Sequence, residues 1–413
     1  MQYGLIGEHL THSYSCDIHG AAAPYTYELK EIPPDELDAF LTERAFSAIN
    51  VTIPYKQTVM PYLDGISDRA RAIGAVNTVV NRDGKLYGDN TDFDGLSALA
   101  KKAGISFTGK KVLILGTGGT SKTALAVATA AGAASVLRVS RTSGNGVITY
   151  EEAIARHTDT QIIINTTPVG MYPHVEDAPP IDVGLFPRLE GVLDAVYNPL
   201  RTKLVQEALS RGIPAMGGLY MLAAQGVYAS AIFQDVDVDP ALIETVYQTV
   251  LQKKQNVVLI GMPSSGKTTV GKALAAITGK AFVDTDDLIV EEIGCSIADY
   301  FAAHGEAAFR KIECEIVSRV ARESGQIIAT GGGAILNADN VAALRRNGIN
   351  VFLNRSPERL ITTKSRPLSS DREALTAMYH KRLPLYRAAA DLEIVADATH
   401  HVVAAAIQKE LSL

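Results

Sequence analysis

Short apolar runs alternate with longer segments of helical periodicity along most of the chain. Runs of this kind predict strands, and the segments between them, in which apolar residues recur every three or four positions, predict helices. The alternation of the two predicts an α/β fold with parallel sheets and helices on both faces. The clearest runs are KVLIL, SVLRVS, QIIIN and GVLDAV in the first part of the chain, and NVVLI, AFVD, QIIAT and NVFLN in the second.

The clearest boundary along the chain lies at LQKKQN, residues 251–256. A helical segment ends there in lysines, and a new apolar strand begins at Val257. We therefore predict a short linker at 251–256 between two parts, each large enough to bury its own core. Within the first part, the polar stretch KKAGISFTGKK separates an N-terminal lobe from the strands that follow.

Composition narrows the class of protein. The chain has 413 residues, of which 47% are hydrophobic and 20% charged, as in ordinary globular proteins. The net charge of −6 and the lack of a dense Lys/Arg run weigh against a nucleic-acid partner. Three scattered cysteines suggest free thiols in a reducing compartment. The first residues lack the pattern of a signal peptide, and Gln225 interrupts the most apolar stretch, 216–233, so we expect a buried helix rather than a membrane span, in a cytoplasmic protein.

The strand that begins at Val257 runs into a glycine-rich loop, GMPSSGKTT, which matches the pattern G-x-x-x-x-G-K-[ST] at every position. In such a loop, backbone N–H groups and a helix N-terminus surround the phosphates of a nucleotide. Lys267 is expected to reach the β- and γ-phosphates, and the Thr268 hydroxyl to bind Mg²⁺. We predict that the ATP site comprises Gly261, Ser264, Ser265, Gly266, Lys267, Thr268 and Thr269.

A second glycine-rich loop, GTGGTSKT, follows the strand KKVLIL. Ser121 stands where a phosphate loop of the first kind needs its last glycine. The loop fits the dinucleotide-binding pattern G-x-G-x-x-[G/A/S] better, with Gly116, Gly118 and Ser121. The alternative is a tight turn between strand and helix that binds no ligand.

The end of the next strand indicates which dinucleotide would bind. An NAD site carries an acidic residue there, whereas this chain has Ser140, Arg141 and Thr142. A guanidinium group and two hydroxyls suit the 2′-phosphate of NADP. A surface arginine without this function is the alternative. We predict an NADP(H) site made of Gly116, Gly118, Gly119, Ser140, Arg141, Thr142 and, on the nicotinamide side, Met171.

Motifs after the phosphate loop indicate what receives the phosphoryl group. They are FVDTDDLI, AFRKIE, ATGGGAIL, KSRPL and KRLPLY, in this order. From about residue 256 onward the chain resembles shikimate kinase, of the nucleoside-monophosphate-kinase-like group. The resemblance implies that Asp284 and Thr268 hold Mg²⁺, and that Asp286 binds the substrate hydroxyls. It further assigns the substrate carboxylate to Arg310 and Arg382, contact with the ring to Gly332, and the transferring phosphoryl group to Lys267 and to Arg366 in a lid that is short for the family.

The first part of the chain carries NVTIPYK, GAVNT and GDNTD, and residues 1–250 resemble shikimate dehydrogenase. The resemblance implies that Lys56 and Asp92 form the catalytic pair. A lysine ammonium held by a carboxylate can donate the proton that a ketone oxygen takes up as hydride arrives. The implied substrate-binding residues are Ser13, Ser15, Thr52, Asn77, Tyr197 and Gln225, with Asp92 also meeting ring hydroxyls. Tyr14 and Cys16 depart from the family pattern, and Asp89 and Asn90 are interpreted as turn residues.

Together the resemblances predict a substrate-binding lobe at 1–100, completed by helices at 216–250, a Rossmann domain at 101–215 and a P-loop kinase domain at 257–413. They imply a bifunctional enzyme that uses NADP(H), ATP and Mg²⁺ to make shikimate from 3-dehydroshikimate and then shikimate 3-phosphate. Two alternatives stay open: a non-catalytic regulator that senses a metabolite, and an NAD-linked quinate/shikimate dehydrogenase fused to a small-molecule kinase. The small-molecule substrates are the expected partners, and the sequence leaves the oligomeric state undefined.

Overall fold

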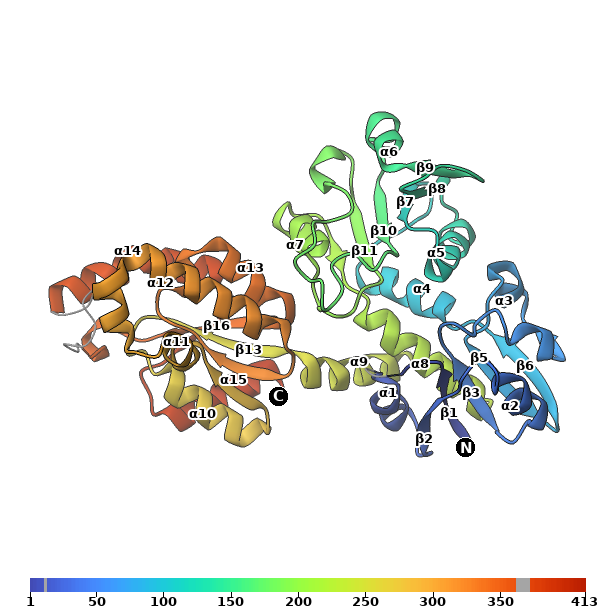
Figure 1. The fold of residues 1–413 in the computed structure, drawn as a ribbon, viewed down its shortest axis with the longest axis horizontal. Coiled ribbons are helices and arrows are strands. Elements are labelled where there is room, and N and C mark those ends of the chain that lie inside the picture. The colour runs from blue at the N-terminus through green and yellow to red at the C-terminus, as the bar shows by residue number, and fades with distance from the viewer. Residues whose placement is uncertain (11–12, 362–371) are drawn as a thin grey trace. The chain divides into compact units, whose positions relative to one another are not determined.

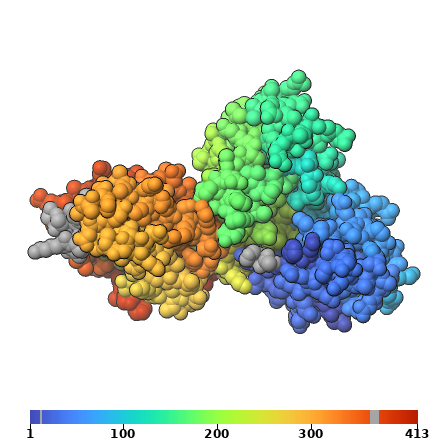
Figure 2. All heavy atoms as spheres, viewed as in Figure 1, coloured from blue at the N-terminus to red at the C-terminus, as the bar shows by residue number. Residues whose placement is uncertain are grey.

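The computed structural model describes residues 1–10, 13–361 and 372–413. The chain divides into two compact units, Met1–Leu251 and Gln252–Leu413. They run from blue to yellow-green and from yellow to red in Figures 1 and 2. Both units are α/β, which confirms the fold class that the alternating apolar runs predicted.

The first unit begins with a mixed sheet in the order β2-β1-β3-β5-β6-β4. β1 pairs in parallel with β2 and β3, whereas β5 pairs antiparallel with β3 and β6. The strands are β1 (Tyr3–Gly7), β2 (Tyr27–Glu31), β3 (Ala48–Val51), β4 (Gly65–Ile66), β5 (Thr78–Arg82) and β6 (Lys85–Asp89). The helices of this lobe are α1 (Ser15–Ala22), α2 (Leu37–Glu43), the 3-10 turn η1 (Met60–Tyr62), α3 (Asp68–Ile73) and α4 (Asp92–Lys102).

The second sheet of this unit is entirely parallel, in the order β12-β11-β10-β7-β8-β9. Numbered within the sheet, this order is 6-5-4-1-2-3, that of a dinucleotide-binding fold. The strands are β7 (Lys111–Leu115), β8 (Ser135–Ser140), β9 (Val147–Thr149), β10 (Ile162–Asn165), β11 (Gly191–Asp194) and β12 (Ala215–Met216). The helices are α5 (Gly119–Ala130), α6 (Tyr150–Arg156), η2 (Val183–Leu185) and α7 (Lys203–Ser210). In Figure 2 the two sheets with their helices form a blue lobe and a green lobe of this unit.

The most apolar stretch of the chain forms α8 (Leu219–Gln234), which is largely buried. It packs against α4 at close range because Gly95 of α4 has no side chain; a Cβ there would lie 2.7 Å from the carbonyl oxygen of Met221. The prediction of a buried helix is therefore confirmed. None of the helices in the part of the chain that the structure describes is long and apolar enough to cross a membrane.

The predicted linker, 251–256, turns out to have regular structure. The last helix of the first unit, α9 (Pro240–Lys254), continues through it, and β13 begins at Asn256. Lys280 Nζ donates to the carbonyl oxygens of Gln252 at 2.5 Å and Gln255 at 3.0 Å. A cation at these carbonyls satisfies acceptors that a helix C-terminus leaves unpaired, and the helix ends in its lysines as the sequence predicted.

The second unit has a parallel sheet in the order β14-β15-β13-β16-β17. Its strands are β13 (Asn256–Ile260), β14 (Ala281–Asp284), β15 (Gln326–Ala329), β16 (Gly348–Asn354) and β17 (Leu392–Val395). Its helices are α10 (Lys267–Thr278), α11 (Thr285–Ile293), α12 (Ile297–Arg322), η3 (Ala334–Leu336), α13 (Ala338–Asn347), η4 (Pro357–Arg359), α14 (Arg372–Ala389) and α15 (His400–Leu411). Figure 1 shows the helices on both faces of this sheet. Apolar clusters line the two faces, so the central strand β13 is fully buried, as its continuous apolar run predicted.

Candidate active sites

The first unit encloses a cavity of about 330 Å³ between its two lobes. Residues of the first sheet and its loops, of the starts of α1, α4 and α5, of the loop after β11 and of α8 line it. The cavity brings together all eight residues predicted for the substrate and the catalytic pair: Ser13, Ser15, Thr52, Lys56, Asn77, Asp92, Tyr197 and Gln225. The lining also includes Thr120, a residue of the motif GTGGTSKT that was not among the predicted site residues, and Met221, which belongs to no motif.

Lys56 and Asp92 form an ion pair in this cavity. Lys56 Nζ lies 2.6 Å from Asp92 Oδ2, and the side chains are 28% and 17% exposed. Asn77 Nδ2 donates to the other carboxylate oxygen, Asp92 Oδ1, at 3.0 Å. The carboxylate is thereby held on both oxygens, while the ammonium keeps enough exposure to reach a bound molecule. Such a pair can deliver a proton to an oxygen in the cavity.

Two of the predicted substrate-binding residues, Ser13 and Ser15, lie at the start of α1. Ser13 Oγ donates to Ser15 Oγ at 2.9 Å, and Ser15 N donates to Ser13 Oγ at 3.1 Å. Tyr14, which departs from the family pattern, packs edge-on against Tyr197, with ring centroids 6.4 Å apart. Burial raises the pKa of the Tyr197 hydroxyl, so that group is a neutral hydrogen-bond donor at physiological pH.

Asp194, at the end of β11, organises the loop that carries Tyr197. It is fully buried and accepts hydrogen bonds from Asn165 Nδ2 at 2.9 Å, Val196 N at 3.0 Å and Thr202 Oγ1 at 2.6 Å. Burial raises its pKa to about 6, and these three donors oppose the shift. Sequence analysis missed this residue, which lies in the run GVLDAV three positions before Tyr197.

The second glycine-rich loop has the geometry of an anion site. α5 begins after Gly118 without a side-chain cap, so its first N–H groups remain available to a ligand. Gly116 has a φ of +109°, and a Cβ there would meet Thr166 Oγ1 at 2.8 Å, whereas Cβ atoms at Gly118 and Gly119 would meet nothing within 4 Å. Ser121 is fully buried against the sheet, as expected for a small residue at this position. The loop therefore has room for a pyrophosphate, which fits NADP.

The residues predicted to select NADP follow the end of β8. Ser140 is the last residue of the strand, and Arg141 and Thr142 are exposed. Arg141 is close enough to Tyr150 to affect its titration: burial raises the pKa of Tyr150, and the positive charge of Arg141 lowers it. An exposed guanidinium beside two hydroxyls fits a 2′-phosphate. Met171, predicted for the nicotinamide side, is 43% exposed and lies outside the lining of the cavity.

The phosphate loop GMPSSGKTT, in the second unit, wraps around the start of α10. Gly261 and Gly266 have φ values of +152° and +96°, which favour glycine. α10 begins after Gly266 with no side-chain cap. Lys267 Nζ donates to the carbonyl oxygens of Gly261 and Met262 at 2.9 Å each. The ammonium thus lies across the mouth of the loop, where nucleotide phosphates would bind.

Thr268 and Asp284 meet beside this loop. Thr268 Oγ1 donates to Asp284 Oδ2 at 2.7 Å, and Asp284 Oδ1 accepts from Asp286 N at 3.0 Å. A hydroxyl and a carboxylate in contact are oxygen ligands of the kind that Mg²⁺ prefers. Among the residues that the structure describes, there is no cluster of three or more His, Cys, Asp or Glu side chains for a metal. The pair therefore fits an ion that takes its other ligands from nucleotide and water.

The three glycines after β15 lie against the residues predicted to bind the second substrate. A Cβ on Gly331 would lie 2.7 Å from Asp286 Oδ1, and one on Gly333 would lie 2.5 Å from Arg310 Nη2. Arg382 Nη1 donates to the carbonyl oxygen of Gly332 at 3.0 Å. Asp286, Arg310, Gly332 and Arg382 are thus gathered at one place. Two other residues were predicted for the kinase unit. Thr269, predicted for the ATP site, lies in the first turn of α10, and Arg366, predicted to contact the transferring phosphoryl group, lies outside the described residues.

Glu313 is a further residue of this site that sequence analysis missed. Its side chain is 1% exposed, and Arg310 Nη1 donates to Glu313 Oε2 at 2.7 Å. Burial raises the pKa of Glu313, the charges of Arg310 and Arg382 lower it, and that of Asp286 raises it. The spacing i, i+3 from Arg310 in FRKIE was the available signal, because residues three apart share a helix face.

Comparison with known proteins assigns both units. The model described as "Shikimate dehydrogenase substrate binding domain" matches residues 5–79, and that described as "Shikimate kinase" matches residues 263–412. The shikimate dehydrogenase (NADP(+)) of Clostridium beijerinckii is 36% identical over 262 residues, which cover 59% of this chain and 96% of that relative. The chain belongs to the shikimate dehydrogenase family. Because its C-terminal part matches the shikimate kinase family, it is a fusion of the two.

Solved structures resemble the dehydrogenase unit. The shikimate 5-dehydrogenase of Thermus thermophilus, in complex with NADP(H) and shikimate, is 30% identical with a TM-score of 0.54, covering 60% of this chain and 99% of that chain. A chorismate mutase/shikimate 5-dehydrogenase fusion protein from Clostridium acetobutylicum is 32% identical with a TM-score of 0.57, covering 60% and 96%. These similarities agree with the dinucleotide-binding strand order of the second sheet.

Proposed function

We propose that the dehydrogenase unit reduces 3-dehydroshikimate to shikimate with NADPH, and that the kinase unit phosphorylates shikimate at its 3-hydroxyl with ATP. The observation that carries the first half is the Lys56–Asp92 ion pair in a cavity that also borders the dinucleotide loop through Thr120. For the second half it is the contact of Thr268 with Asp284 beside a complete phosphate loop.

In the reduction, NADPH supplies the hydride. Lys56 donates a proton to the substrate oxygen as negative charge develops on it, and Asp92 holds the ammonium in place. Ser13 and Ser15 are proposed to bind the substrate carboxylate, and Thr52, Asn77, Tyr197 and Gln225 its ring hydroxyls. Arg141, Ser140 and Thr142 are proposed to select NADP through its 2′-phosphate.

In the phosphorylation, Lys267 leaves the carbonyls of its own loop and neutralises the phosphates, while Thr268 and Asp284 hold Mg²⁺. Asp286 orients the attacking hydroxyl. Arg310 and Arg382 bind the carboxylate, because planar guanidinium groups match carboxylate geometry. Arg366 is proposed to stabilise charge on the transferring group. Phosphoryl transfer depends on positioning and charge neutralisation, and this set provides both.

The two alternatives lose support. A non-catalytic regulator would not need Lys56, Asp92, Lys267 and Asp284, yet all four are present, and each contacts groups of its own site. An NAD-linked quinate/shikimate dehydrogenase would not need Arg141 at the end of β8.

One assay of the whole chain tests the proposal. Purified protein is given 3-dehydroshikimate, NADPH, ATP and Mg²⁺, and shikimate and shikimate 3-phosphate are measured. Lys56→Ala should abolish reduction and leave phosphorylation of added shikimate intact, and Lys267→Ala should do the reverse. Exposed lysines, Lys101→Ala and Lys272→Ala, serve as matched controls that should retain both activities. Failure of the unmodified chain to form either product would refute the proposal.

A further inference from the structure

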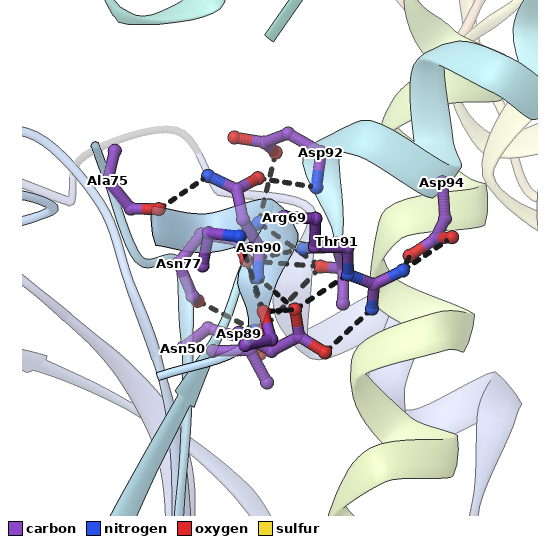
Figure 3. A network of polar contacts seen from close by, with 12 residues as sticks. Asn50, Arg69, Ala75, Asn77, Asp89, Asn90, Thr91, Asp92 and Asp94 are labelled. Atoms are coloured by element: carbon purple, nitrogen blue, oxygen red, sulfur yellow. Dashed lines mark hydrogen bonds and ion pairs between the residues drawn. The ribbon is translucent and has the colours of Figure 1, made fainter. Parts of the chain in front are cut away.

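Asp92 is carried by the turn between β6 and α4, and this turn is bound on two sides (Figure 3). β6 ends at Asp89, and α4 begins at Asp92 itself. The carboxylate therefore depends on the path of residues 89–94 for its position opposite Lys56. The N-cap residue of α4, Thr91, makes no side-chain capping hydrogen bond, so the turn takes its shape from other contacts.

The inner side of the turn is fixed by amides. Asn90 is 1% exposed, donates to the carbonyl oxygen of Ala75 at 2.8 Å, and accepts from Asp92 N at 3.1 Å. Asn77 Oδ1 accepts from Thr91 N at 2.8 Å. The predicted turn role of Asn90 thus has a physical basis, and the Asp92 backbone is tied to it directly.

On the outer side of the turn, one guanidinium group contacts both Asp89 and Asp94. Arg69 Nε donates to Asp89 Oδ1 and Nη2 to Asp89 Oδ2, each at 2.7 Å, so this contact is bidentate. The third nitrogen, Nη1, lies 2.8 Å from Asp94 Oδ1 and 2.6 Å from Asp94 Oδ2. Figure 3 shows the guanidinium between the two carboxylates. Arg69 therefore joins the residue that ends β6 to a residue in the first turn of α4.

The charges make this arrangement depend on the arginine. Burial raises the pKa of Asp89, but the hydrogen bonds from Arg69 and Ser67 outweigh it and hold that pKa below its usual range. Burial raises the pKa of Asp94, and the neighbouring Asp89 raises it further against the attraction of Arg69. Without the guanidinium, two carboxylates would face each other across the turn, and their repulsion would push its ends apart.

We propose that Arg69 is a positioning residue of the dehydrogenase reaction, which closes the turn from Asp89 to Asp94 and so holds Asp92 against Lys56. The proposal rests on the proposed function of this unit. Partly exposed ion pairs contribute little to stability, so the main effect of Arg69 is on geometry. A displacement of a catalytic group by about 1 Å is enough to lower a rate by about a hundredfold.

The test compares Arg69→Met with Arg71→Met in the whole chain. Arg71 lies on the same helix, α3, is exposed, and donates to the carbonyl oxygen of Ile66 at 3.4 Å, away from the turn. We expect Arg69→Met to lower kcat for 3-dehydroshikimate reduction at least tenfold while KM for NADPH stays within twofold. Arg71→Met should change kcat by less than twofold, and phosphorylation by the same chain should be unchanged in both.

A conservative variant distinguishes positioning from a general structural role. Arg69→Lys keeps one positive charge but cannot form the bidentate contact, so it should recover part of the lost kcat. A kcat for Arg69→Met within twofold of the unmodified chain would overturn the proposal, as would a tenfold rise in KM for NADPH alongside the fall in kcat. If Arg69→Met does not fold by circular dichroism, Asp94→Asn decides: it should lower kcat at least threefold, and an unchanged kcat overturns the proposal. An unmodified chain that does not reduce 3-dehydroshikimate refutes the proposed function instead.

Discussion

The substitution Gly333→Ala would test the kinase site, because the added methyl group would contact Arg310. Gly333 has φ −104° and ψ −5°, a conformation that alanine adopts without backbone strain, so Gly333→Ala should leave the unit folded. The added Cβ, however, would lie 2.5 Å from Arg310 Nη2 and 2.8 Å from Arg310 Cζ. Ordinary contacts begin near 3.4 Å, so the guanidinium must move by about 1 Å. Because it is the end of a flexible side chain, the backbone can stay in place.

The expected result is a loss of substrate affinity in a unit that stays folded. A hydrogen bond to a charged group contributes about 1.5–3 kcal/mol. Its loss should raise KM for shikimate by about 10- to 100-fold, since 1.4 kcal/mol is a factor of ten. Initial rates of phosphorylation are measured against shikimate at saturating ATP, with the urea midpoint of the kinase unit and the dehydrogenase rate as controls. KM for ATP should stay within twofold.

A double-mutant cycle shows whether the effect passes through Arg310. In an Arg310→Ala background, Gly333→Ala should change KM for shikimate by less than twofold, because the displaced group is gone. An unchanged KM in the single variant would refute the reasoning, and so would equal effects of Gly333→Ala in both backgrounds.

Two further predictions concern the dehydrogenase unit. Burial raises the pKa of Asp194 from 3.8 to about 6, so the folded state binds the proton more tightly than the unfolded state. The stability from this group is therefore fully present below about pH 4 and falls by about 3 kcal/mol as the pH rises through 6. The free energies of urea unfolding of the unmodified chain and of Asp194→Asn are measured over that pH range, with amide exchange as the probe of this unit. The difference between the two free energies should change with pH, and a difference independent of pH would contradict the prediction. Arg141→Ala should lower kcat/KM for NADP at least tenfold and leave the value for NAD within twofold in initial-rate assays; equal losses with both coenzymes would show that Arg141 does not contact the 2′-phosphate.

Local patterns predicted much of the fold. KVLIL, SVLRVS, NVVLI and AFVD coincide with strands β7, β8, β13 and β14, because each is a complete apolar run bounded by polar or small residues. Both glycine-rich loops lie between a strand and a helix, as their motifs require. The contact of Lys280 with the end of α9 could not be predicted in the same way, because the two lie far apart along the chain.

In the candidate sites too, local motifs could be predicted from the sequence, whereas contacts between distant residues could not. Residues that carry the chemistry, such as Lys56, Asp92 and Lys267, lie in contiguous motifs and could be identified from the sequence. Glu313 and Asp194 could not, since their importance depends on burial and on partners that are distant in the sequence or on another element.

Arg69 shows why this difference has consequences for function. Its neighbours on α3 form no recognisable motif, and Asp89 was interpreted as a simple turn residue. Only in the folded chain does one guanidinium contact residues five positions apart, on either side of Asp92. An ion pair of 2.6 Å between Lys56 and Asp92 needs a turn that holds one shape. The inner amides set the direction of that turn, and Arg69 offsets the repulsion between the carboxylates at its two ends. The reactivity of the motif therefore depends on a residue outside it, and substitutions at Arg69 should affect kcat before they affect folding.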